Sequence, residues 1–362
     1  MKQGLSAFVG LLILMCTFLF LSAGLSLSLP SPVKMPEKVL DIPKGTGFLG
    51  IVDLLTREGV IRDRLSFGLL AIVQGKAKQM RAGEYLFKNS MFPDDILSKL
   101  ATGDELFHTF TIPEGYNLFQ IARLVQEAGL VKEKMLLDKA RDNSFLSFAG
   151  IKGTSAEGYL FPDTYRFRKS AGAEEILKAM IERFKQVYRE EYEKRAQELG
   201  FTREEVIILA SMVEKETGVS WEKPLIAAVF KNRLKKKMRL QCDPTVIYGL
   251  TNFHGDLTRE HLNSDTLFNT YRFIGLPPAP IANPGNEALV AVLYPAQVNY
   301  LYFVSRNDGT HCFSNTLQEH NRAVDKYQKR LKMVGTNNTG TGVEGSRGRG
   351  VKPKKQTTVN SG

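Results

Sequence analysis

Two stretches of the chain, seventy residues apart, share one pattern of proline, glycine and apolar residues. Each begins with an Ile-Pro-x-Gly turn, at residues 42–45 in the first copy and 112–115 in the second. Apolar residues then follow at helical spacing until a glycine, Gly59 or Gly129, ends the helix. An aromatic segment typical of a strand comes after each copy. This repetition predicts a duplicated small α+β unit, with the two second strands at residues 83–87 and 158–161.

An uncharged apolar run occupies residues 5–29, and only Lys2 precedes it among charged residues. A single helix needs roughly 20 apolar residues to cross a bilayer. We therefore expect a cytoplasmic tail at residues 1–4, a transmembrane anchor at residues 5–29 and export of the remaining chain. The alternative is a signal peptide cleaved near residues 22–24.

The balance of charge suits an acidic partner, because Lys and Arg number 49 against 38 Asp and Glu, a net charge of +11. Nucleic acid, anionic lipid and cell-wall peptides with carboxylates would all fit. Export across a membrane argues against nucleic acid. The carboxyl-terminal residues 334–362 are rich in Gly, Thr and Asn and show no apolar periodicity, which predicts that they are disordered. Their charge is positive, so we expect a disordered basic tail.

Cysteine and histidine usage excludes two classes of site. Cys16 lies in the apolar run, so the most that could form outside the cytoplasm is one disulfide between Cys242 and Cys312, and a disulfide scaffold is excluded. The five histidines show no HExxH or other ligand spacing. We expect neither a metal nor a cofactor.

The stretch from Thr202 to Tyr248 contains the candidate catalytic acid. Thr202 and Glu205 form a capping box, and the apolar run at residues 206–213 predicts a buried helix. Two glutamates, Glu214 and Glu216, lie at its end, where burying an ionised carboxylate is costly unless it is paired or protonated. Helical-wheel geometry places Glu216 nearer the apolar face, so we expect it to be the more buried and to have a raised pKa, as a general acid requires.

The alternative for these glutamates is that both are solvated or paired with a nearby base. Lys215, Lys223 and Arg233 are the candidates for such pairing.

A series of short motifs follows the chain in order from residue 157 to residue 304. Together they resemble the YceG-like family of membrane-anchored endolytic murein transglycosylases, over about residues 42–331. The motifs are EGYLFPDTY at 157–165, EKET at 214–217, NRL at 232–234, MRLQ at 238–241, DPTV at 243–246, YG at 248–249, NTY at 269–271, GLPP at 275–278, IANPG at 281–285 and YLYFV at 300–304.

The resemblance implies an α+β fold in three parts: a single amino-terminal transmembrane helix, a small LysM-like α+β module at residues 38–108 and a larger catalytic domain at residues 109–333. It also implies residence in the bacterial cytoplasmic (inner) membrane with an extracytoplasmic catalytic domain. LysM-like modules often hold glycan; packing against the neighbouring domain is the alternative here.

The resemblance also implies the site residues. The family's catalytic glutamate falls on Glu216, in agreement with the helical wheel. Binding of the acetamido sugar, or stabilisation of developing charge, would fall to Gln241, Asp243, Asn269 and Tyr271, for each of which a structural role is the alternative. This chain departs from the family at Cys242, where a small hydroxyl residue is usual, and at Phe268, where a tyrosine is common.

The activity implied is cleavage of the β-1,4 bond between N-acetylmuramic acid and N-acetylglucosamine inside nascent peptidoglycan strands, leaving 1,6-anhydro ends and terminating elongation. One carboxylate suffices because the muramyl C6 hydroxyl attacks in place of water. Peptidoglycan glycan strands are then the substrate, and peptidoglycan synthases such as penicillin-binding proteins are expected neighbours.

Three other classes of function compete with this interpretation. Residues 220–223 fit the S-x-x-K pattern of penicillin-binding enzymes, although no K-T-G follows. A noncatalytic scaffold could bind wall glycan through the duplicated units. A hydrolase could use Glu216 and Asp243 as its two carboxylates.

Several further elements are predicted from local patterns. They are a helix at 93–102, a long helix at 173–199, a helix at 220–234 capped by Ser220, a cleft wall at 275–285, a hairpin of a buried strand at 301–305 with 310–313, and a closing helix at 319–331.

Overall fold

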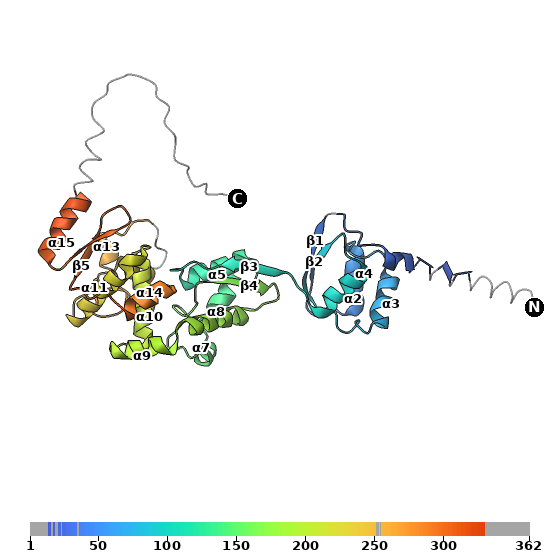
Figure 1. Cartoon of the computed structure of the whole chain (residues 1–362), viewed down its shortest axis with the longest axis horizontal. Coiled ribbons are helices and arrows are strands. Elements are labelled where there is room, and N and C mark those ends of the chain that lie inside the picture. The colour runs from blue at the N-terminus through green and yellow to red at the C-terminus, as the bar shows by residue number, and fades with distance from the viewer. Residues whose placement is uncertain are drawn as a thin grey trace, which may run out of the picture. The chain divides into compact units, whose positions relative to one another are not determined.

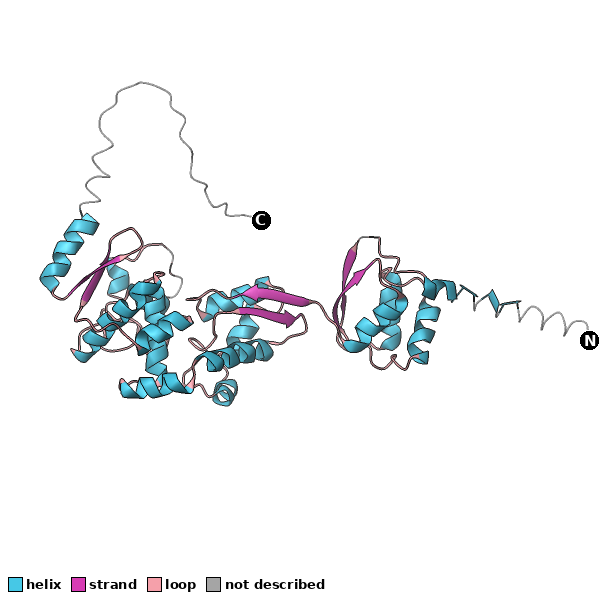
Figure 2. Cartoon of the chain, viewed as in Figure 1, coloured by secondary structure: helices cyan, strands magenta, loops and turns pink. Residues whose placement is uncertain are grey.

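The computed structural model describes residues 14–15, 17–18, 21–22, 24–34, 36–250, 253 and 255–329. These residues belong to two compact units, one ending at Val298 and the other starting at Asn299. The architecture is mixed α+β, as predicted (Figures 1 and 2). No helix in the described part of the chain combines the length and the apolar character that a membrane crossing requires.

Three of the predicted segments cannot be compared with the structure. The tails at residues 1–4 and 334–362, and much of the predicted anchor at 5–29, lie outside the described residues. The boundary between a module at 38–108 and a domain at 109–333 stays a prediction.

The first copy of the repeat is a two-stranded sheet with helices beside it (Figure 1). Its strands β1 and β2 are antiparallel, with Val39 opposite Leu86. Apolar residues of both strands and all three helices form its core, in which Ile51 and Leu97 have no more than 1% of their surface exposed. The elements are β1 (Glu37–Ile42), α2 (Phe48–Arg57), α3 (Arg64–Val73), β2 (Gly83–Lys88) and α4 (Pro93–Thr102).

The second copy repeats this order of elements. Helices α2 and α5 begin at Phe48 and Leu118, which confirms the predicted offset of seventy residues. An additional helix, α7, separates the second copy's helices from its second strand. The elements are β3 (Phe107–Thr111), α5 (Leu118–Glu127), α6 (Glu133–Lys139), α7 (Asn143–Ala149), β4 (Thr164–Arg168) and α8 (Ala173–Val187).

The second strand of this copy was predicted wrongly at residues 158–161, because β4 spans Thr164–Arg168. Gly158 adopts a left-handed φ of +87°, which a strand does not contain, and a Cβ there would meet Pro280 and Ile207. The strand forms where buried Tyr165 and Phe167 alternate with exposed Arg166.

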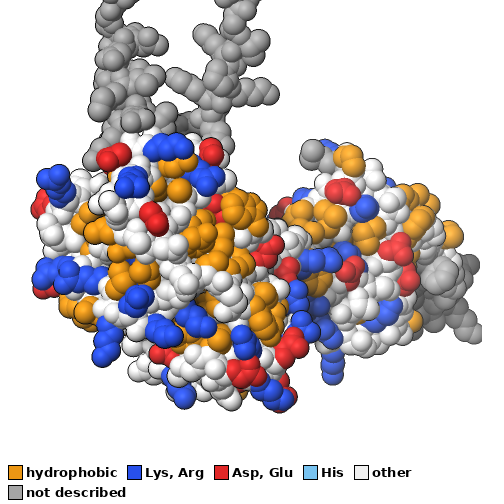
Figure 3. All heavy atoms as spheres, turned by 60° about the vertical axis from the view of Figure 1, so that its left-hand side comes forward, with side chains coloured by type: hydrophobic (Ala, Val, Ile, Leu, Met, Phe, Trp, Pro, Cys, Tyr) orange, Lys and Arg blue, Asp and Glu red, His pale blue; other side chains and the backbone are white. Residues whose placement is uncertain are grey.

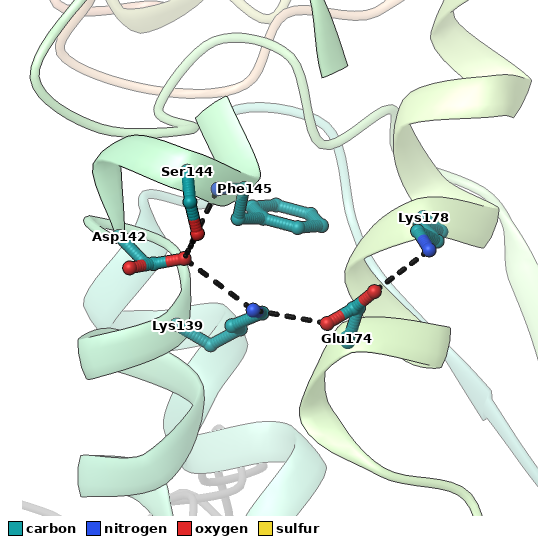
Figure 4. Close-up of polar contacts among 6 residues, drawn as sticks. All are labelled: Lys139, Asp142, Ser144, Phe145, Glu174 and Lys178. Carbon is teal, nitrogen blue, oxygen red and sulfur yellow. Dashed lines mark hydrogen bonds and ion pairs between the residues drawn. The ribbon is translucent and has the colours of Figure 1, made fainter. Parts of the chain in front are cut away.

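A polar network at the surface joins α6 and α7 to α8 (Figure 4). Lys139 lies 3.4 Å from Asp142 and 2.9 Å from Glu174, and Glu174 lies 2.7 Å from Lys178. Asp142 also caps α7 by accepting a hydrogen bond from the Phe145 backbone. Since these charged groups are partly or largely exposed to solvent, each ion pair contributes little to stability.

Helix α10 (Arg203–Glu216) is the buried helix around which the following helices pack. Every residue from Val206 to Val213 is buried, and the predicted capping box is present, with Thr202 and Glu205 joined by bonds of 2.8 and 3.2 Å. Helices α11 and α14 pack against it. The other elements are α9 (Glu190–Glu198), η1 (Ser220–Glu222), α11 (Lys223–Lys235), α12 (Asp243–Gly249), α13 (Arg259–Leu262) and α14 (Asn286–Leu293).

Two of the predicted helices have different bounds. The long helix at 173–199 is broken, because Tyr188 takes a ψ of 78° and stacks its ring on Phe184 while meeting Tyr192 edge-on. The helix predicted at 220–234 begins at Lys223, after the short 3-10 turn η1. Ser220 is therefore not its cap, and the Ser220 hydroxyl instead bonds to the Glu287 carboxylate.

The second unit contains the predicted hairpin. Strands β5 (Tyr302–Ser305) and β6 (His311–Ser314) pair antiparallel with Val304 opposite Cys312. The first strand is partly exposed, not buried as predicted. The closing helix starts earlier than predicted, at Leu317, because Thr316 caps it; α15 (Leu317–Val324) then continues as the π-helical η2 (Asp325–Lys329).

Candidate active site

Glu214, the first of the two glutamates at the end of α10, forms an ion pair with a lysine. Glu214 lies 3.1 Å from the ammonium of Lys223 and accepts a hydrogen bond of 3.0 Å from the Gly285 backbone. Only 7% of its side chain is exposed. Glu214 is therefore a buried carboxylate whose charge is already neutralised.

Glu216 lies in a different environment. Arg233 is a cation whose charge acts on its carboxyl group, but this effect is smaller than that of burial. Burial raises the pKa of Glu216 to about 7; the negative charge of Asp243 adds to the increase, and Cys242 and Arg233 oppose it. A carboxyl group with this pKa can donate a proton near neutrality and take one back.

Cys242, in the segment after α11, is in contact with this acid. Its thiol is within hydrogen-bond reach of the Glu216 carboxyl, and its burial and that charge raise the thiol pKa, so the neutral S–H is retained as a donor. Its backbone is fixed by Thr270 at 3.0 Å and by the Thr245 hydroxyl at 2.6 Å. Among the residues that the structure describes, Cys242, which is buried, and Cys312, which is partly exposed, are both free thiols.

Asp243 and Tyr271 form the other polar pair beside Glu216. The Tyr271 hydroxyl donates a hydrogen bond of 2.5 Å to Asp243. Burial and the Asp243 charge raise the pKa of Tyr271, so its hydroxyl stays protonated. Gln241, two residues earlier, is exposed, and its side-chain oxygen accepts from Arg233 at 3.2 Å. Gln241, Asp243 and Tyr271 are thus brought together near the acid.

Asn269 differs from the other three predicted binding residues because it is fully buried, with 0% of its surface exposed. Its amide nitrogen donates to Leu262 and Ser264 at 3.0 and 2.7 Å, and its oxygen accepts from the Tyr271 backbone at 3.0 Å. This geometry is that of the alternative role, a turn contact. Asn269 holds the segment that presents Tyr271.

A groove of ≈ 760 Å³ passes beside these residues. Lys215 and Pro244, the chain neighbours of Glu216 and Asp243, lie along it, and Ile281 brings the predicted wall segment into its lining. The amino-terminal turns of α5 and the end of α12 form its other walls. Its lining residues are Asn117, Phe119, Gln120, Arg123, Lys215, Pro244, Ile247, Tyr248, Gly249, Leu250, Phe253 and Ile281.

Comparisons with known proteins show the family of this chain. The sequence profile of the YceG-like family matches residues 40–326. The chain belongs to the YceG-like family. A protein of Bacillus subtilis named endolytic murein transglycosylase is 33% identical over 319 residues, which cover 83% of this chain and 88% of the relative.

Two further relatives support the same assignment. A Streptococcus pneumoniae protein of the same name is 29% identical over 318 residues, or 79% of this YceG-like chain, which spans 57% of that relative. The crystal structure of a YceG-like protein from Listeria monocytogenes has a TM-score of 0.56 and 31% identity, covering 79% of this chain and 99% of its own.

One buried acid of this YceG-like protein, Glu157, was not predicted from the sequence to be a site residue. Its carboxylate accepts from the Leu118 backbone at 2.9 and 3.1 Å, from Tyr248 at 2.9 Å and from Asn283 at 2.8 Å. These partners belong to α5, α12 and the segment after Pro280, which are three walls of the groove. Glu157 is 1% exposed, and burial raises its pKa to about 7 against the effect of these bonds.

Replacement of Glu157 by glutamine is expected to raise the KM for glycan about tenfold or more, with a smaller fall in kcat, because a lost bond to a charged acceptor costs about 1.5–3 kcal/mol. Steady-state kinetics on uncross-linked glycan strands check this. Glu105→Gln is the matched control, since Glu105 is also buried but bonds to Ser170 and Arg168. Equal effects of the two substitutions on KM would rule out a positioning role.

In this YceG-like chain the lysine of the Ser-x-x-Lys pattern is not free to act as a base. Lys223 is 4% exposed and lies 3.1, 3.5 and 3.7 Å from three carboxylates, those of Glu214, Glu287 and Glu114. Although burial opposes it, these charges raise the pKa of Lys223, which therefore cannot act as the base of a Ser-x-x-Lys site. Across the residues that the structure describes, no cluster of three or more His, Cys, Asp or Glu side chains could hold a metal ion.

Proposed function

We propose that this YceG-like protein is an endolytic murein transglycosylase in which Glu216 is the catalytic acid and then the catalytic base. The observation that carries the proposal is the Glu216 carboxyl group, whose pKa burial raises to about 7 and whose chain neighbour Lys215 lines the groove. The names of the Bacillus and Streptococcus relatives support the reaction class. A noncatalytic scaffold would have no use for a carboxyl group with so raised a pKa in this position.

The first step is the breaking of the glycosidic bond. Glu216 donates its proton to the oxygen that links N-acetylmuramic acid to N-acetylglucosamine, and the bond from that oxygen to the muramyl C1 breaks. Positive charge then develops at C1, where a nearby carboxylate is favourable. Asp243 is exposed and held by Tyr271, so it can supply that charge.

The second step forms the anhydro ring. The muramyl C6 hydroxyl attacks C1, and the Glu216 carboxylate takes the hydroxyl proton, which restores the acid for the next turnover. Gln241 binds an acetamido group in this proposal, which its exposure and its bond from Arg233 support. Asn269 acts indirectly, through the segment that carries Tyr271.

A hydrolase would need a second carboxylate to activate water or to attack C1. A hydrolase would have to use Asp243 in that role, because Glu157 is buried with three donors. Attack by the substrate's own hydroxyl makes neither necessary. The transglycosylase reaction therefore fits the carboxylates that this site offers.

The rate of cleavage is expected to fall as the pH rises through about 7, because the first step requires protonated Glu216. Below that pH kcat/KM should level off, and above it the loss should approach about tenfold per pH unit. Initial rates of anhydro-end release across this range check the prediction. A rate that rises through neutrality would contradict it.

The endolytic mode of cutting can be tested by the size of the products. Long uncross-linked glycan strands should shorten to intermediate lengths before disaccharides accumulate. Chromatography of the strands during digestion by the purified protein measures this. Early accumulation of disaccharides from otherwise full-length strands would indicate cutting from the ends and would sink the endolytic assignment.

We propose in addition that residues 5–29 anchor the chain in the cytoplasmic membrane, with the rest outside the cytoplasm and close to peptidoglycan synthases. The uncharged run behind Lys2 supports this topology. Protease added to sealed spheroplasts should digest the chain beyond residue 30. Protection from the protease would contradict this topology, and a soluble product trimmed at its amino terminus would indicate signal-peptide cleavage.

A further inference from the structure

A second pocket, here called the arginine pocket, lies beside Tyr271 and has a volume of ≈ 640 Å³. Arg239, Arg259 and Arg272 line it, together with Leu262, Asn263 and Tyr271. Its lining contains three cations and no carboxylate. On the face shown in Figure 3, Lys and Arg side chains lie singly or in small groups among hydrophobic ones.

The backbone around Arg239 is held in an uncommon conformation. Lys237 and Gln241, on either side, have left-handed φ values of 54° and 51°, which non-glycine residues adopt at a cost. The buried Arg233 side chain fixes the segment by donating to the carbonyl groups of Arg239 and Leu240 at 3.3 and 2.8 Å. This support places the Arg239 side chain in the pocket.

The charges of two of the arginines are available to a ligand. Arg239 and Arg259 are exposed, and within the described residues neither forms an ion pair. The Arg272 guanidinium already has protein partners: it donates a hydrogen bond of 3.0 Å to the Asn263 carbonyl and lies 3.6 Å from the Asp265 carboxylate. Unpaired guanidinium groups that converge on one pocket are suited to carboxylate or phosphate ligands.

The arginine pocket adjoins the proposed catalytic residues. Tyr271 forms part of its wall and donates its hydroxyl hydrogen to Asp243, whose charge acts on Glu216. A muramyl residue bound at Glu216 carries its stem peptide on the lactyl group at C3. The peptide of the sugar being cut must therefore leave the glycan near this point.

We propose that the arginine pocket binds carboxylate groups of the peptidoglycan stem peptide, through Arg239 and Arg259. This proposal rests on the proposed function, because it takes the substrate to be a peptide-bearing glycan. A pyrophosphate at the lipid-linked end of a nascent strand is the other anion of such a substrate. It occurs once per strand, at the end, whereas an internal cutting site meets a stem on every muramyl residue that has kept its peptide.

The test compares three forms of lipid-free glycan strand: with intact stems, with stem carboxylates converted to amides, and with stems removed by an amidase. Wild-type protein should cleave the first about tenfold better in kcat/KM than the other two, as expected for two charge-assisted contacts at a partly solvated site. Arg239→Gln/Arg259→Gln should bring this ratio close to one. Lys235→Gln/Lys236→Gln removes the same charge from exposed residues outside the pocket and should keep the ratio.

Several outcomes would overturn the proposal. One is equal cleavage of the three forms by the wild type, and another is an unchanged ratio in the arginine variant. A preference that appears only when a lipid pyrophosphate end is present would assign the pocket to phosphate.

If the proposed function itself is wrong, the result will be different: none of the three forms of strand will be cleaved. Calorimetry with Glu216→Gln protein and a disaccharide carrying a tetrapeptide stem then tests the pocket alone. Binding should weaken about tenfold when both arginines are replaced in that background, and undiminished binding would contradict the proposal. Thermal melts of each variant exclude misfolding as the cause.

Discussion

Replacement of Glu216 by glutamine is expected to abolish release of anhydro-ended glycan while leaving the fold and glycan binding intact. Glutamine keeps the shape of the side chain but can neither donate nor accept the catalytic proton. Proton transfer by one group is typically worth about 10²–10⁴-fold, and more is expected here because Glu216 serves in both steps. Anhydro-muropeptide release by the purified variant, measured beside the wild type, checks this.

The stability of the same variant should depend on pH in a particular direction. The pKa of Glu216 is raised from 4.5 to about 7 in the folded chain, so wild type loses stability as the pH rises through that interval. Glutamine cannot ionise. Thermal melts should therefore show Glu216→Gln more stable than wild type above neutrality and closer to it at low pH.

Glu214→Gln is the matched control at the same end of α10. It weakens the contact with Lys223, so we expect a loss of stability with much less effect on the chemistry. Near wild-type release by Glu216→Gln, or a dead Glu214→Gln variant with a normal melt, would show that the acid has been assigned to the wrong residue.

Replacement of Lys223 by methionine is expected to destabilise the fold by about 3–5 kcal/mol, because removing one member of a buried ion pair leaves the other charge uncompensated. Glu214, with only 7% of its side chain exposed, then loses the cation with which it is paired. Urea unfolding near neutral pH measures the loss. The loss should shrink as the pH falls, because the clustered carboxylates take up protons, among them Glu114, whose pKa is raised mainly by burial.

Lys178→Met provides the comparison for that prediction. Lys178 forms an ion pair with Glu174 on the surface, with 41% of its side chain exposed, and its removal should change stability little. Equal losses in the two variants, or a loss at Lys223 that does not depend on pH, would mean that this buried cation does not hold the cluster together.

Much of the fold could be predicted from the sequence because its signals are local. The capping box at Thr202 and the apolar run behind it specify α10, and the repeated turn and helix pattern specifies α2 and α5. The strand β4 was misplaced because the conformation at Gly158 depends on packing against Pro280, far along the chain. Local aromatic content alone does not report such contacts.

The candidate site, too, could be predicted only in part from the sequence. Periodicity favoured Glu216 over Glu214, but what separates them in the structure is the pairing of Glu214 with Lys223 and Gly285. Glu157 could not be recognised as a site residue, because its partners at Leu118, Tyr248 and Asn283 converge only in the folded chain. The motif at residues 157–165 marked its position without indicating its role.

The central claim is that the substrate's own hydroxyl, and not water, completes the cleavage at Glu216. Digestion of uncross-linked glycan strands in oxygen-18 water, followed by mass spectrometry of the new muramyl ends, tests it most directly. The expected result is 1,6-anhydro ends without oxygen-18. Reducing ends that carry one oxygen-18 atom would show that the enzyme is a hydrolase and would contradict the mechanism.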